Sequence, residues 1–217
     1  MTGHPARSRP IVIGLTGSIG MGKSSTARMF RRLGVPVYEA DAAIHRLLAP
    51  GGRGVLPVRA AFPEADDGRG GIDRRRLGAR VFDDPAALAR LEDILHPLAR
   101  TIEADFFARC RRQRRRLVVL DIPLLFETGG ERRVDLTVVV TAPAFLQRQR
   151  VLARPGMTAE KFDRIRARQM SDGEKRARAD VIIHTGLGFG HTARQVKRLV
   201  RALTYRDRQT AEGPCAK

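Results

Sequence analysis

The residues with the clearest chemical capacity lie near the amino terminus, in the run Gly17-Ser18-Ile19-Gly20-Met21-Gly22-Lys23-Ser24. This run fits the phosphate-binding pattern G-x-x-x-x-G-K-[ST], in which backbone N–H groups and the start of the following helix surround an anion. Lys23 could reach the β- and γ-phosphates of a nucleoside triphosphate, and the Ser24 hydroxyl could bind Mg²⁺. The pattern predicts a nucleotide site, with Ser25 at its end; the alternative is a glycine-rich turn.

The elements on either side of this loop favour the nucleotide site. Residues 11–15 form an apolar run that is typical of a buried parallel strand, and residues 25–33 have helical character. A strand, a glycine loop and a helix in this order are the context in which the pattern has its mechanism.

Further apolar runs predict the rest of a sheet. Strands are expected at 35–38, 117–120, 136–140 and 181–183, with helical segments between most of them. This alternation predicts a doubly wound α/β fold with a mainly parallel sheet. We expect a disordered extension at 1–10, one domain over 11–206 and a flexible tail at 207–217.

Two helical regions are expected beside the sheet. Residues 42–116 predict a mostly helical region for the second substrate, with Pro97 breaking or kinking a helix that runs from Pro85 to Arg116. Residues 142–178 predict a second helical block, in which Pro143 is the first residue of a helix, Pro155-Gly156 ends it and Thr158 caps the next. Residues 146–178 of this block are expected to form a lid. The lid is rich in arginine; the alternative is an exposed basic helix pair. Its arginines are Arg148, Arg150, Arg154, Arg164, Arg166 and Arg168.

Two aspartates follow predicted strands, where the carboxyl ends of parallel strands converge on a ligand crevice. Asp41 could accept a proton from an acceptor hydroxyl, or it could cap a helix that starts at Ala42. Asp121 has the position of a Walker B carboxylate, which assists Mg²⁺. The turn that it opens, Asp121-Ile-Pro-Leu-Leu-Phe-Glu127, could line an acceptor pocket.

Two histidines are weaker candidates. His45 and Arg46 lie one helical turn after Asp41 and could contact an anionic acceptor. His96 precedes Pro97, a position where a lone histidine is more often structural.

The composition favours a basic protein of a reducing compartment. The chain has 217 residues and a formal net charge of +18, carried mostly by arginine. The cluster Arg109–Arg116 could bind nucleic acid, but no aromatic side chains for base stacking are interleaved with it, and a solvated helix end is favoured. The two cysteines predict no disulfide framework; Cys110 could be reactive or a spectator thiol. We find no secretory signal and no apolar run long enough for a membrane span, so the cytoplasm is expected.

Taken together, the motifs resemble those of the dephospho-CoA kinase family from residue 11 to about 205. The matching elements are Gly14–Ser24, Ala40-Asp41, Leu95-His-Pro97, Asp121–Glu127, Gln147-x-x-Arg150-x-x-x-Arg154, Gln169-Met170 and Ala179-Asp180.

The resemblance implies ATP-dependent phosphorylation of the ribose 3′-hydroxyl of dephospho-CoA. It implies that Asp41 is the base or orienting group, that Gly20–Ser25 hold the ATP phosphates with Arg150, and that Arg154 is the lid arginine. The helical region would bind the CoA moiety, with His96 and the Asp121–Glu127 turn, including Leu124, near the acceptor.

Two positions depart from the family pattern. Glu39 replaces the first aspartate of the common Asp-Ala-Asp, so no role transfers to that carboxylate. The run Ile183-His-Thr-Gly186 lacks an asparagine, so adenine contacts do not transfer. The alternatives are a nucleoside or nucleotide kinase and a basic nucleic-acid-dependent NTPase; the oligomeric state stays open.

Overall fold

The computed structural model describes the backbone of residues 9–212 and the side chains as far as Tyr205. The chain forms two compact units. The first, here called the sheet unit, comprises the chain up to Tyr38 and from Cys110 onward; the second, the helical unit, is Glu39–Arg109. Residues 1–8 of the expected extension and 213–217 of the expected tail lie outside the described residues.

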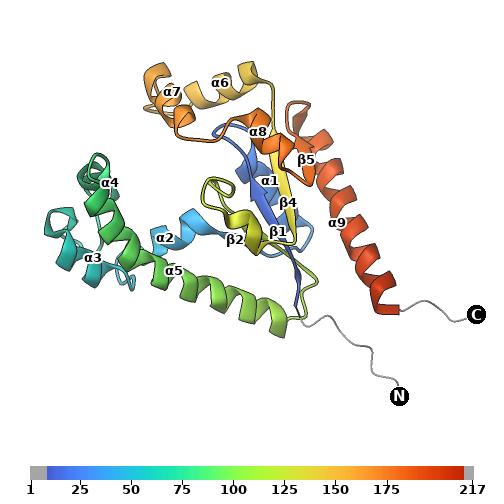
Figure 1. The fold of residues 1–217 in the computed structure, drawn as a ribbon, viewed down its shortest axis with the longest axis horizontal. Helices are drawn as coiled ribbons and strands as arrows, with labels where there is room; N and C mark the ends of the chain where they lie inside the picture. Colours follow the sequence, from blue (N-terminus) through green and yellow to red (C-terminus); the bar gives the residue numbers. More distant parts are fainter. Residues whose placement is uncertain (1–8, 213–217) are drawn as a thin grey trace, which may run out of the picture. The chain divides into compact units, whose positions relative to one another are not determined.

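The five predicted strands are confirmed, and with them the α/β fold. They are β1 (Ile11–Thr16), β2 (Val37–Glu39), β3 (Leu117–Asp121), β4 (Leu136–Thr141) and β5 (Val181–His184), in the order β2-β3-β1-β4-β5 (Figure 1). β1 pairs in parallel with β3 and β4, and β4 pairs in parallel with β5.

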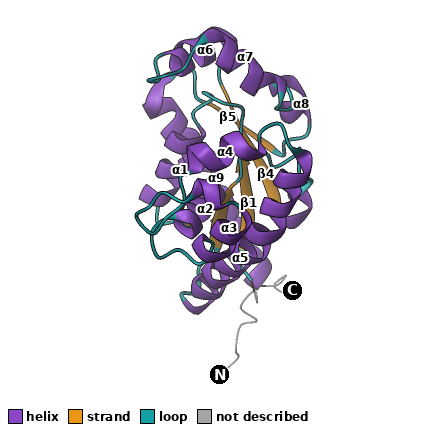
Figure 2. Ribbon diagram, turned by 90° about the vertical axis from the view of Figure 1, so that its left-hand side faces the viewer, coloured by secondary structure: helices purple, strands orange, loops and turns teal. Residues whose placement is uncertain are grey.

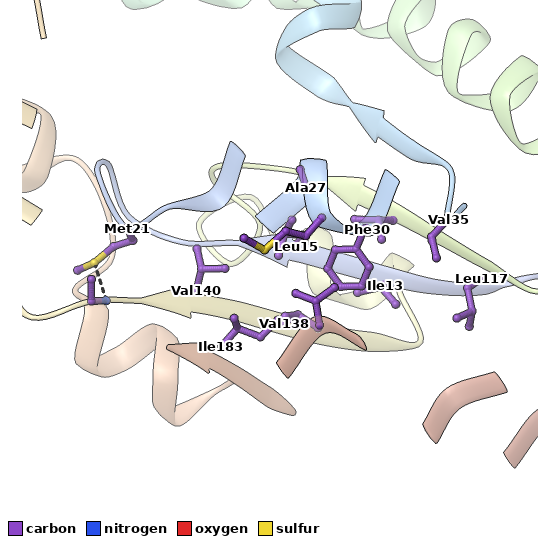
Figure 3. Close-up of a cluster of buried hydrophobic side chains, with 14 residues drawn as sticks. Ile13, Leu15, Met21, Ala27, Phe30, Val35, Leu117, Val138, Val140 and Ile183 are labelled. Carbon is purple, nitrogen blue, oxygen red and sulfur yellow. Dashed lines mark hydrogen bonds between the residues drawn. The ribbon is translucent and has the colours of Figure 1, made fainter. Parts of the chain in front are cut away.

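The sheet is held by a core of apolar side chains from both its strands and the helices beside it. Phe30, on helix α1 (Lys23–Arg32), is fully buried in the same cluster as Ile13 and Val138 (Figure 3). Burying a side chain of this size stabilises the fold by about 1.5–3 kcal/mol. The α1 helix is thereby held against the sheet, and its amino end is held where β1 ends.

The strand order places the functional loop at the topological switch point of the sheet. From β1 the chain passes to β2 and β3 on one side, and afterwards to β4 and β5 on the other. Ligands of such sheets bind beyond the carboxyl ends of the strands at this point. The parallel register pairs Leu15 with Asp121, so the end of β3 lies level with the end of β1.

The remaining helices of the sheet unit follow the predicted pattern with shifted ends. They are α6 (Ala144–Leu152), α7 (Ala159–Ala167), α8 (Asp172–Ala177) and α9 (Gly188–Glu212), with a short 3-10 turn at Gly130–Arg133. The Thr158 hydroxyl accepts the Lys161 N–H, which confirms the predicted cap. Pro143 was expected at the first helical position but is the N-cap of α6. Because α9 continues to Glu212, residues 207–212 of the expected tail are helical.

The helical unit has a core of its own. Its helices are α2 (Ala40–Leu48), α3 (Val55–Ala61), α4 (Arg74–Val81) and most of α5 (Pro85–Arg112), joined by loops and a 3-10 turn at Pro63–Ala65 (Figure 2). Leu47, Val58 and Phe62 are buried together with Leu91 and Leu95. This separate core makes Glu39–Arg109 a compact unit of its own, whereas the expected helical region was 42–116.

Pro97 lies inside α5 and does not break it, so of the predicted break or kink the break was wrong. Proline removes the hydrogen bond to the carbonyl of the residue four positions earlier, here Asp93. Both residues lie on the exposed side of the helix, where water can bind that carbonyl, while Leu91 and Leu95 hold α5 in the core. The helix ends at Arg112, four residues before the predicted end.

The basic cluster lies at and after the end of α5, as favoured for a solvated helix end. Arg109 and residues 111–116 are exposed, whereas Cys110 is buried. Cations at the carboxyl end of a helix interact favourably with its dipole. Among the described residues, no helix is both long and apolar enough to cross a membrane.

Candidate active site

The phosphate loop connects β1 to α1 and ends in a helix start that has no side-chain cap. Gly22 is the N-cap of α1 and has φ 93°, a left-handed conformation that glycine adopts without steric cost. The first turn of α1 contains no acidic residue. The unpaired N–H groups and the positive end of the helix dipole therefore converge on one point, an arrangement that suits an anion.

Lys23 and Asp121 are brought together beside this helix start. The Lys23 Nζ forms an ion pair with Asp121 Oδ1. The aspartate is 4 % exposed and the lysine side chain 18 % exposed. A cation and a carboxylate are thus adjacent, although 98 residues separate them in the chain.

The three serines of the loop differ in their surroundings. Ser24 is exposed, and the Ser25 hydroxyl accepts a hydrogen bond of 3.2 Å from Arg28. Ser18 is only 5 % exposed, and its hydroxyl has no hydrogen-bond partner among the described residues. Leaving a buried hydroxyl unsatisfied costs about 1–3 kcal/mol, so a ligand oxygen that paired with Ser18 would recover that cost.

Other loop contacts are internal or run to the predicted lid. The Met21 N–H donates to the Ser18 carbonyl at 3.1 Å, and Met21 Sδ accepts the Ala142 N–H at 3.2 Å, shown as a dashed line in Figure 3. The backbone of Ile19 forms hydrogen bonds with two side chains: its N–H donates to Gln169, and its carbonyl accepts from Gln147. These glutamines were not predicted as site residues, although both stand among the elements that match the family pattern; Gln147 is buried on α6, and Gln169 is half-buried in the bend after α7.

The two predicted lid arginines have different environments. Arg150 donates to the Thr185 hydroxyl at 3.1 Å and to the Thr185 carbonyl at 2.9 Å, and the Thr185 hydroxyl donates to the Met21 carbonyl at 2.7 Å. Arg150 therefore links α6 to the phosphate loop through Thr185. Arg154 is exposed in the turn between α6 and α7.

The turn after β3 is fixed by a buried lysine. Lys175 of α8 is fully buried and lies 2.8 Å from Glu127 Oε1, which also accepts the Met170 N–H at 2.9 Å. Burial alone would raise the pKa of Glu127, but the hydrogen bonds from Lys175 and the backbone outweigh it and the pKa is lowered. Glu127 is thus an ionised structural partner, and Leu124 in the same turn is exposed.

The other predicted acceptor residues belong to the helical unit. Asp41 is exposed in the first turn of α2; the N-cap is Glu39, so the alternative interpretation of Asp41 as the cap was wrong. His45 lies one turn later, and its Nε2 is bound by Arg74 from α4, a residue that was not predicted. His96 is exposed on α5. Among the described residues, no three His, Cys, Asp or Glu side chains are grouped to hold a metal ion.

Comparison with known proteins identifies the family. Residues 11–187 match the family model described as dephospho-CoA kinase. The chain is 64 % identical over 165 residues to the dephospho-CoA kinase of Paramagnetospirillum magneticum, an alignment that covers 76 % of this chain and 77 % of the relative.

A second relative belongs to the same family, and a solved structure has a similar fold. The dephospho-CoA kinase of Rhodospirillum rubrum is 60 % identical over 178 residues, covering 82 % of this chain and 84 % of the relative. A crystal structure from Thermus thermophilus superposes with a TM-score of 0.80 at 36 % identity, covering 89 % of this chain and 97 % of that one. This chain belongs to the dephospho-CoA kinase family.

Proposed function

We propose that this protein transfers the γ-phosphoryl group of ATP to the ribose 3′-hydroxyl of dephospho-CoA, giving CoA and ADP in the final step of CoA biosynthesis. The family membership supports the reaction, and one observation in the structure carries the proposal. The Lys23–Asp121 pair lies beside a helix start that has neither a side-chain cap nor an acidic first turn. Such an arrangement favours a polyanionic nucleotide over other ligands.

The nucleotide is held mainly by backbone and by lysine. Gly20–Ser25 surround the phosphates with N–H groups, and Lys23 neutralises the charge that develops on the transferred group. Arg154, exposed beyond the end of α6, is free to turn toward the phosphates, whereas Arg150 is already bound to Thr185 and acts through that contact.

Ser24 and Asp121 are the residues that we propose to hold Mg²⁺. Both offer oxygen atoms, the ligand type that Mg²⁺ prefers, and a site of two protein oxygens completed by phosphates and water is usual for this ion. The buried carboxylate of Asp121 at the strand end fits this role. When bound, the ion would neutralise phosphate charge; Lys23 and the loop supply the positioning.

The acceptor is oriented by the helical unit. We propose that Asp41 accepts or orients the proton of the 3′-hydroxyl, and that His45 and His96 contact the rest of the substrate. Asp41 and His45 are four residues apart on α2 and thus share one helix face, which is exposed. Leu124, exposed in the turn after β3, is a further substrate contact, and Glu127 contributes by holding that turn.

The reaction is assigned to the cytoplasm because two distant cysteines without a disulfide framework suit a reducing compartment. The net charge of +18 leaves one alternative to test, an NTPase that is stimulated by nucleic acid.

The test is a single assay with three acceptors. Purified protein is mixed with Mg-ATP and either dephospho-CoA, nucleoside monophosphates or RNA, and ADP is followed. We expect ADP only with dephospho-CoA, together with an equal amount of CoA. ADP release that depends on RNA, or phosphorylation of a nucleoside monophosphate, would contradict the proposal.

A further inference from the structure

The peptide groups around Ile19 are bound on both sides by side chains from the predicted lid. The Ile19 N–H donates to Gln169 Oε1 at 3.0 Å, and Gln147 Nε2 donates to the Ile19 carbonyl at 2.8 Å. Gln147 is 5 % exposed, although glutamine is mostly a surface residue. The burial of this polar side chain beside the loop indicates that it has a function.

These two hydrogen bonds determine which way the neighbouring peptide groups point. In a trans peptide the C=O and the following N–H point in opposite directions, and the described chain has no cis peptide. Because the Ile19 carbonyl points to Gln147, the Gly20 N–H points away from α6. Because the Ile19 N–H points to Gln169, the Ser18 carbonyl points the other way, and it accepts the Met21 N–H at 3.1 Å.

The position of Gln147 is fixed by close packing of α6 on the loop. A Cβ atom built on Gly20 would lie 2.5 Å from Val151 and 3.0 Å from the Gln147 carbonyl oxygen, and Gly20 has a φ of 79°. Only glycine fits there, so α6 contacts the loop backbone directly. The backbone of Gln147 is therefore held beside the loop.

Gln169 is fixed by the turn after β3. The next residue, Met170, donates its N–H to Glu127, and Glu127 is held by the buried Lys175. The segment Gln169-Met170 thus connects the phosphate loop to the Asp121–Glu127 turn. The loop amide and the acceptor-side turn are joined through two adjacent residues.

We propose that Gln147 and Gln169 are positioning residues that keep the Gly20 N–H directed at the nucleotide phosphates. Neither side chain needs to touch the nucleotide. If the Ile19–Gly20 peptide flipped, a carbonyl oxygen would face the phosphates and repel them. Gln147 acts as a donor to hold this peptide, and Gln169 acts as an acceptor to hold the one before it.

This difference between donor and acceptor gives a test with opposite outcomes at the two positions. Gln147→Glu replaces the donor by a carboxylate facing a carbonyl, and should raise the dissociation constant for ADP at least about tenfold more than Gln147→Met. Gln169→Glu keeps an acceptor for the Ile19 N–H, and should bind ADP at least about threefold more tightly than Gln169→Met. Titration calorimetry with Mg-ADP measures all four variants.

Three controls separate positioning from general damage. Gln149→Glu adds the same charge on the exposed side of α6 and should bind ADP like the wild type. The KM for dephospho-CoA should stay within about twofold in every variant that binds ATP. Melting temperatures identify unfolded variants; should Gln147→Glu not fold, the proposal is judged on Gln147→Met, which should also raise the dissociation constant, and on the position-169 pair.

The proposal is wrong if the Glu and Met variants have the same order of ADP affinity at position 147 and at position 169. It is also wrong if ADP affinity is unchanged throughout, or if KM for dephospho-CoA rises in proportion to that for ATP.

Discussion

The sheet unit and the helical unit hold their candidate site residues in different ways. In the sheet unit two ion pairs lie inside the protein, Lys23 with Asp121 and Lys175 with Glu127, and only Arg154 of the charged candidate residues is exposed. In the helical unit Asp41, His45 and His96 are exposed on helix surfaces. The groups proposed for the nucleotide are therefore held largely by contacts of the chain itself, whereas the groups proposed for the acceptor are open to solvent.

The difference in burial between the charged groups of the two units has an energetic consequence. A charge that is buried with its partner cannot be removed without leaving the other charge desolvated, so substitutions in the sheet unit should affect both stability and activity. An exposed carboxylate can be neutralised with little effect on stability. Substitutions of the exposed groups in the helical unit should therefore affect activity alone.

The largest expected effect is that of Lys23→Met. Removing the cation nearest to the transferred group should lower kcat/KM on the order of 10³-fold or more, as measured by steady-state ADP release. The melting temperature should change as well, because Asp121 would lose its ion pair with Lys23 in a buried position. An activity within tenfold of the wild type would show that Lys23 does not stabilise the transition state.

Asp41→Asn should come next. If Asp41 orients or deprotonates the hydroxyl, kcat should fall about 10²- to 10³-fold, while ADP affinity and melting temperature stay at wild-type values. Exposed Asp105 on α5, changed to Asn, is the matched control and should keep full activity. A clearly lower melting temperature of Asp41→Asn would contradict the expectation that exposed groups of the helical unit affect activity alone.

Lys175→Met tests the buried pair of the sheet unit. It leaves the Glu127 carboxylate without its cation, and should lower the free energy of unfolding by about 2–3 kcal/mol, a value reduced from that of a fully buried pair because Glu127 is partly exposed. Chemical denaturation measures this. The double variant Lys175→Met with Glu127→Gln should recover part of the lost stability, because no unpaired charge remains. No recovery would mean that the Lys175–Glu127 ion pair is not the source of the lost stability.

The smallest expected effect is a dependence of the protein's stability on pH, caused by the ionisation of Glu127. Its pKa is lower in the folded state than in the unfolded state, so its ionised form stabilises the fold. This contribution is complete above the unfolded pKa, about 4.3, and is lost as the pH falls through the folded pKa. In denaturation curves, the stability gap between the wild type and Glu127→Gln should narrow over that acidic range. A gap that widened on acidification would contradict the lowered pKa.

Much of the fold could be predicted because its helices and strands depend on short stretches of the sequence. Continuous apolar runs gave all five strands, Pro155-Gly156 separated α6 from α7, and the Thr158 cap was placed correctly. Where prediction was wrong, tertiary packing had outweighed a local preference. Pro97 stays inside α5 because its turn faces solvent while neighbouring leucines are buried.

The candidate site was predictable only in part. The loop and the strand-end position of Asp121 follow from motif and order, and the structure brings Lys23 and Asp121 together. The roles of Asp41, His45, His96, Leu124 and Arg154 stay predictions. Gln147, Gln169 and Lys175 were missed as site residues, because a sequence shows that a residue is polar but not which distant peptide it will face.

The sequence alone determined the glycine loop, the order of strands and helices, and hence the family, since each depends on residues close together in the chain. Only the tertiary structure decided that Lys23 meets Asp121, that two lid glutamines hold Ile19 and that Lys175 is buried against Glu127. These contacts join residues from 48 to 150 positions apart. Strand register and helix packing bring them together, and both are properties of the whole fold.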